Sequence, residues 1–161
     1  MKKELKRARK AIDELLKVLG ENQVDKENLD KAIDKLHDKV ASLEEELQKT
    51  VTEMQKLERK IHKKVNKIAK VKKLLLKADT DRKLETYDRE YRQLMKELKK
   101  LDKEYAKLRE KYEALVLKEE KALEKEMFLE EEAAKLAHRE YSAIAKLQSA
   151  MGDLSSQLNR Y

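Results

Sequence analysis

The densest group of chemically active side chains is a basic run in the first half of the chain. It extends from Arg59 to Lys77 and holds nine positively charged residues without one acidic residue. Side chains of this kind bind phosphate groups, either on nucleic acid by releasing counterions or on anionic lipid heads. The predicted patch for an acidic partner consists of Arg59, Lys60, Lys63, Lys67, Lys70, Lys72, Lys73 and Lys77.

A structural alternative explains the same lysines as solvated side chains on a charged helix. They are spread around the helix instead of along one face, and no aromatic residues for base stacking stand among them. Lysine pairs with a facing acidic arm contribute little individually. The acidic residues available on that arm are Glu85, Asp88, Glu90, Glu97, Asp102 and Glu104.

The net charge of +7 belongs entirely to the first half of the chain. Residues 1–80 hold 22 basic and 15 acidic residues, whereas residues 81–161 hold 18 of each. A second basic segment, residues 2–10, belongs to an amphipathic helix whose form suits an anionic membrane surface. Its apolar side lacks aromatic residues and matches the end of the chain, so packing against another helix is the alternative that we favour.

Enzyme chemistry is not indicated. The three histidines are scattered, and Asp34, His37 and Asp38 lie within one helical turn, a spacing that could donate to a metal. The chain contains no glycine-rich phosphate loop, nucleophile elbow or zinc-protease spacing. We therefore expect no catalytic residue, no metal site, no cofactor and no small-molecule substrate.

The elements that carry these residues are long helices. From Leu29 to Ala78, apolar residues recur at alternating spacings of four and three, which predicts a coiled-coil helix with a narrow apolar seam. The chain has no proline, so long unbroken helices are permitted. The seam is Leu29, Ile33, Leu36, Val40, Leu43, Leu47, Thr50, Met54, Leu57, Ile61, Lys64, Ile68, Val71, Leu75 and Ala78.

A second seam begins after Asp79-Thr80-Asp81, whose short polar side chains favour helix caps and turns. Folding the chain at residues 79–81 places the two seams opposite each other, with Lys64 facing Leu94 and Met54 facing Tyr105. We therefore predict an all-α fold, a long antiparallel coiled-coil hairpin, as a single elongated helical domain. The second seam is Leu84, Tyr87, Tyr91, Leu94, Leu98, Leu101, Tyr105, Leu108, Tyr112 and Leu115.

A break is predicted at residues 20–25, because Gly20 is a natural helix end and Asp25 can cap a new helix. The expected helices are residues 2–19, 26–78 and 82–158. In one arrangement helix 1 continues in line and pairs with the end of the chain. In the other it folds back at Gly20.

From Leu129 onward the apolar face widens, which favours more than one partner helix. Either a three-helix base or an interface between subunits satisfies it. The predicted assembly surface consists of Leu136, Tyr141, Ile144, Leu147, Met151, Leu154 and Leu158.

These features favour a non-enzymatic structural or adaptor protein, a rigid coiled coil that acts through protein partners and through self-assembly. The alternatives are a membrane-surface or membrane-remodelling protein that binds anionic lipid through residues 2–10 and 59–77, and a nucleic-acid-associated coiled coil that uses the basic run. No stretch approaches the roughly 20 apolar residues of a membrane span. A cytoplasmic location is the default expectation.

Overall fold

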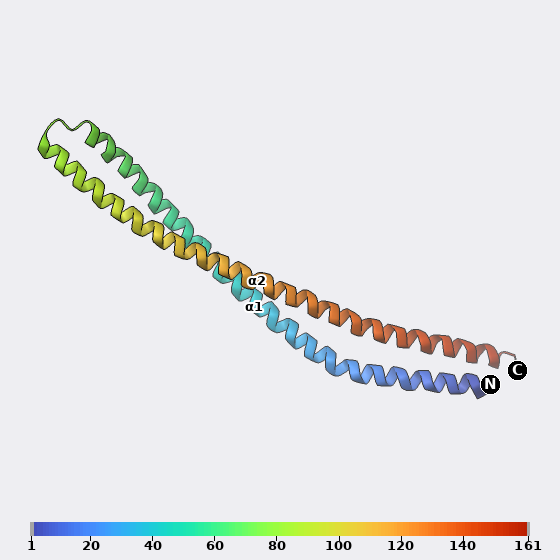
Figure 1. The fold of residues 1–161 in the computed structure, drawn as a ribbon. Helices are drawn as coiled ribbons and strands as arrows, with labels where there is room; N and C mark the ends of the chain where they lie inside the picture. The colour runs from blue at the N-terminus through green and yellow to red at the C-terminus, as the bar shows by residue number, and fades with distance from the viewer. Residues whose placement is uncertain (1, 161) are drawn as a thin grey trace. The chain divides into compact units, whose positions relative to one another are not determined.

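The computed structural model describes residues 2–160, which form two helices that pack against each other (Figure 1). Helix α1 comprises Lys2–Leu76 and helix α2 comprises Asp81–Leu158. No strand occurs within this described part of the chain. The predicted all-α helical hairpin is therefore confirmed.

The connection between the helices is short and capped. At the end of α1 the backbone N–H of Lys77 donates to the carbonyl oxygens of Lys73 and Leu74. The Thr80 hydroxyl oxygen accepts the backbone N–H of Lys83 at 3.3 Å, which satisfies a donor that the first turn of α2 would otherwise leave open. The predicted turn at residues 79–81 is confirmed, with both helix bounds within two residues of their expected positions.

The predicted break at residues 20–25 is wrong, because α1 runs unbroken through this segment. Neither glycine has a positive φ, so Gly20 does not take the left-handed conformation that ends many helices. Asn22 lies fully buried against α2, and its side-chain amide donates to the Leu136 carbonyl oxygen at 3.0 Å. Packing against α2 therefore overrides the local end signals.

Of the two arrangements considered for helix 1, the structure has the one that continues in line. Helix 1 is the first part of α1 and continues in line, since Arg7 pairs with Asp153 at 3.2 Å. It does not fold back at Gly20. The described residues contain two helices and no third helix, so a three-helix base within one chain is absent.

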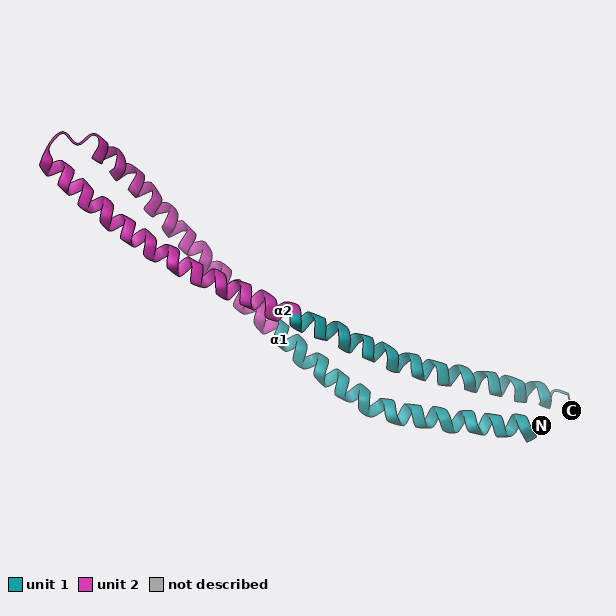
Figure 2. Ribbon diagram, in the orientation of Figure 1, with its two compact units in different colours: residues 1–40, 121–161 teal, residues 41–120 magenta. Residues whose placement is uncertain are grey.

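The contacts divide between two compact units, coloured separately in Figure 2. Unit 1 pairs the chain up to Val40 with the chain from Lys121 onward, and unit 2 comprises Ala41–Glu120. In each unit, a segment of α1 lies antiparallel to a segment of α2.

The core of unit 1 is built from small side chains. Ala8, Ala11 and Ala150 form a buried cluster, against which Leu147 and Leu154 pack. The buried residues of this cluster are thus alanines, and larger side chains lie partly buried beside them.

The first part of α1 is consequently rotated from its predicted orientation. Leu5, Ile12 and Leu19 continue the heptad register of the predicted seam toward the start of the chain, yet they are 46%, 41% and 41% exposed. Their neighbours Ala11 and Val18 lie in the core instead. The seam returns to the predicted positions beyond Ala32 and Ile33, which are both half-buried, as at a stutter in a coiled coil.

Unit 2 has a larger-residue core, with Leu57, Val71, Leu94 and Leu115 buried. Thr50 is also buried, and its hydroxyl donates to the Glu46 carbonyl oxygen of its own helix at 2.8 Å. The hydroxyl group is thus satisfied without a partner on α2. The four seam tyrosines are half-buried, as expected of amphipathic core residues: Tyr87, Tyr91, Tyr105 and Tyr112.

In unit 2, two side-chain contacts join residues that lie about one helical turn from the predicted partners. Lys64 pairs with Glu97, three residues beyond its predicted partner Leu94. The Tyr105 hydroxyl donates to Glu58 at 2.8 Å, four residues beyond Met54. In unit 1, Asn22 contacts Leu136 directly.

Candidate functional site

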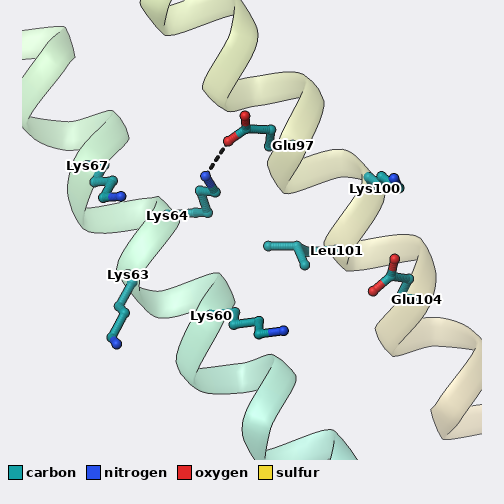
Figure 3. A pocket seen from close by; sticks show the side chains of 8 residues that line it. All are labelled: Lys60, Lys63, Lys64, Lys67, Glu97, Lys100, Leu101 and Glu104. Carbon is teal, nitrogen blue, oxygen red and sulfur yellow. Dashed lines mark hydrogen bonds and ion pairs between the residues drawn. The ribbon is translucent and has the colours of Figure 1, made fainter.

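Two surfaces of the hairpin combine residues that could bind a partner. The first is a shallow hollow in unit 2, shown in Figure 3. Lys60 and Lys64 extend from α1 toward α2, and Leu101 of α2 forms an apolar contact area between the arms. The complete lining is Lys60, Lys63, Lys64, Lys67, Glu97, Lys100, Leu101 and Glu104.

One lysine of this hollow is neutralised by a carboxylate. Lys64, half-buried in the seam, forms an ion pair with Glu97, which also accepts a hydrogen bond from Gln93 at 3.4 Å. The hydrogen bond from Lys64, with a smaller contribution from Gln93, lowers the pKa of the Glu97 carboxyl group below its ordinary value of 4.5. The Lys64 ammonium thus has a fixed position at the edge of the core.

The other lysines of the hollow form no ion pair with any described residue, although the charge of Lys67 also contributes to lowering the pKa of Glu97. Among residues 2–160, no carboxylate lies within ion-pair distance of Lys60, Lys63, Lys67 or Lys100. Five lysines against two glutamates give the lining a formal charge of +3. This excess suits a ligand with several negative charges.

The hollow contains only part of the predicted patch. Lys60, Lys63 and Lys67 lie there together, whereas the other five predicted residues lie outside its lining. Those five are exposed, four of them on α1 and the last directly after its end: Arg59, Lys70, Lys72, Lys73 and Lys77. Sequence reasoning missed Lys100, because it belongs to the other arm and is brought to the hollow only by the pairing of the helices.

One flank of unit 1 is charged, and ion pairs on this flank join α1 to α2. Arg7 pairs with Asp153, Glu14 with Lys146, and Glu21 with Arg139, at 3.1–3.3 Å. The residues on α1 are seven apart, and so are those on α2. Each of these residues directly precedes a core position of its helix, so all six lie on the same flank.

The opposite flank of unit 1 is apolar and is the second candidate surface. Residues that directly follow core positions lie here, and on α1 they include Leu5, Ile12 and Leu19, together with one charged residue, Arg9, which follows Ala8. The neighbouring Leu16 is 63% exposed. On α2 the corresponding exposed residues are Tyr141, Ile144, Met151 and Leu158.

The structure therefore divides the predicted assembly surface in two. Leu136, Leu147 and Leu154 are half-buried in the seam with α1. Tyr141, at 77% exposure, lies on the apolar flank with Ile144, Met151 and Leu158. The widened apolar face found in the sequence is thus a covered seam beside an uncovered one.

The histidine cluster considered in the sequence is not assembled as a metal site. His37 instead contacts Glu126 of α2, with 2.7 Å between Nε2 and Oε1. Within residues 2–160, no group of three or more potential ligands is placed to hold a metal ion. Neither α1 nor α2 contains, in its described residues, a segment apolar enough to cross a membrane.

Comparison with known proteins finds no matching family, no matching curated protein and no matching solved structure.

Proposed function

We propose that this chain is a non-enzymatic structural or adaptor coiled coil that acts through protein–protein contacts, including contacts between its own copies. The observation that carries the proposal is the apolar flank of unit 1. Leu16 and Tyr141 on that flank are more than half exposed, and apolar side chains from both helices accompany them. Extended exposed apolar surfaces of this kind typically mark interaction sites.

The two helices of the hairpin present their surface side chains to such partners at regular intervals. Both arms are helical along their described length, so a contact made on one turn is repeated at heptad spacing on the next. The hollow of unit 2 is shallow, unlike the enclosed sites in which most catalysis takes place. Function therefore depends on surface contacts.

The test is sedimentation velocity of the full chain over a wide concentration range, with helicity followed by circular dichroism. We expect species heavier than the 19.0 kDa single chain to form as concentration rises, without loss of helicity. A folded single chain at every concentration would contradict self-association.

A second candidate function is binding of nucleic acid through the lysine hollow, favoured by its four unpaired lysines from two helices. Double substitution of Lys60 and Lys67 with glutamate should weaken duplex binding and flatten its salt dependence, because phosphate contacts release counterions. Substitution of Lys72 and Lys73 with glutamate makes the same charge change outside the hollow. Equal weakening by both pairs would mean that the hollow has no special role.

A further inference from the structure

Helix α2 carries a second heptad series in unit 1, separate from the one that packs on α1. Its members recur at spacings of four and three, and every one of them is exposed. Only Glu130 is charged. We call this series the outer seam: Leu123, Met127, Glu130, Ala134, Ala137, Tyr141, Ile144, Gln148, Met151, Ser155 and Leu158.

A regular seam at this spacing indicates that the partner packing on it is a helix. The alternating spacing keeps side chains along one line of a helix, and such a line packs into the holes of another helix. The other seam of α2, formed by its buried and half-buried residues, already packs against α1. The exposed residues Leu5, Ile12, Leu16 and Leu19 of α1 lie on the same flank as the outer seam, so the uncovered face is two helices wide.

Near the end of α2, charged side chains lie away from the face that carries the outer seam. Between residues 140 and 159 the only charged side chains are Glu140, Lys146 and Asp153. All three pair with α1, through Lys26, Glu14 and Arg7 respectively. In a chain with 45% charged residues, the rest of this helix surface is uncharged, which removes the electrostatic cost of covering it.

We propose that a second copy of this chain covers the outer seam, with the two α2 helices antiparallel, so that two hairpins form a four-helix bundle. This inference rests on the proposed function and specifies its partner. An isologous contact requires a surface complementary to itself. The outer seam and the apolar residues of α1 beside it provide such a surface, since each hairpin contributes two helices to the bundle.

The distribution of charge selects the second copy and its antiparallel direction. Residues 2–10 hold six basic residues and one acidic residue, a charge of +5. Residues 124–132 hold five glutamates and one lysine, a charge of −4. The antiparallel arrangement brings the basic segment of each copy to the level of the acidic segment of the other. An anionic membrane would be repelled by those glutamates.

Reversal of the outer seam also places large side chains opposite small ones. Ala134 meets Ile144 of the second copy, and Ala137 meets Tyr141. Met127 meets Met151, two flexible side chains that adapt to each other. Alternation of large and small residues is the arrangement that fills a helical interface at the density of a protein core.

The first experiment measures the dimer dissociation constant by sedimentation equilibrium for the double variant Ile144→Glu and Met151→Glu. Both residues are exposed in the single hairpin, so helicity should be retained. We expect the dissociation constant to rise at least about tenfold, because two carboxylates would be desolvated without partners. The matched control is Ser142→Glu with Ser149→Glu, on the charged side of α2, which should leave dimerisation unchanged.

The second experiment tests direction, using the absence of native cysteine in the chain. Chains with Ala137→Cys and chains with Tyr141→Cys are oxidised separately and as a mixture. We expect the mixture to form a disulfide-linked dimer in much higher yield than either chain alone. High yield from Ala137→Cys alone would indicate parallel helices and overturn the arrangement.

The outcomes separate this inference from the proposed function. Association of the wild type that is equally strong in both glutamate variants would overturn the outer seam as the interface, while self-association itself would stand. A wild-type chain that never associates would contradict both.

Discussion

The side-chain amide of Asn22 lies 3.0 Å from the carbonyl oxygen of Leu136 and joins the two helices from a position without solvent exposure. It does so within the segment whose local sequence predicts a break. The hydrogen bond compensates for burial of the amide donor, whereas Asn22 Oδ1 has no donor among the described residues. A polar core residue of this kind fixes register at some cost in stability.

Replacement of Asn22 with aspartate, a change of almost no volume, should destabilise the hairpin by roughly 2–4 kcal/mol at neutral pH, because it buries a carboxylate. Burial raises the pKa of such a group, so the loss should grow as pH rises above the ordinary aspartate value of about 3.9 and shrink below it. Urea unfolding at several pH values measures this dependence. Asn28→Asp, at an exposed position, is the control and should have little effect.

Replacement of Gly20 with alanine should stabilise the protein by about 1 kcal/mol, since glycine in a helix interior loses more backbone entropy on folding. An added Cβ would meet nothing within 4 Å, so no clash opposes the gain. Thermal unfolding should show a higher midpoint. A lower midpoint would mean that the chain needs glycine here, as it would at a true break.

Replacement of Ala150 with leucine should destabilise the protein by about 1–3 kcal/mol, because the small-residue core of unit 1 has no room for it. Ala145→Leu adds the same volume at an exposed position of α2 and serves as the control. Chemical unfolding compares the two variants. Equal stability would show that the helices of unit 1 do not approach closely at Ala8 and Ala150.

The ion pair of Lys64 and Glu97 should make part of the stability of the hairpin sensitive to acid. The pKa of Glu97 is lowered in the folded protein, so the pair stabilises fully above the ordinary value of 4.5. That stability is lost as pH falls through the folded-state pKa. Glu97→Gln should therefore be less stable than wild type at neutral pH and approach it in acid. A stability difference that does not change with pH would count against the pair.

The hairpin and its turn were predictable because heptad spacing and helix caps are local features. Asp79-Thr80-Asp81 carries its signal in adjacent residues, and the Thr80 cap confirms it. Continuity at Gly20 was not predictable, because the contact that stabilises it comes from Leu136 on the other arm. The burial of Ala11 in place of Ile12 was also not predictable, since both residues fit an apolar seam and the outcome depends on packing against α2.

The candidate surfaces were only partly predictable, because some of their residues are adjacent in sequence and others are brought together only by the pairing of the two helices. The basic run identified Lys60, Lys63 and Lys67, which share one helix, but not Lys100, which reaches the hollow only through helix pairing. The wide apolar face was visible from Leu129 onward. Its division into a covered seam and an outer seam depends on where α1 lies.

The most direct test of the antiparallel dimer is the chemical accessibility of the outer seam as a function of protein concentration. A single cysteine at position 144, made by Ile144→Cys, is treated with a maleimide over a range of concentrations, and Ser142→Cys on the other side of α2 serves as the reference. We predict that the reaction at position 144 slows as protein concentration rises, while the reaction at position 142 stays constant. Equal rates at every concentration would show that no second copy covers the outer seam.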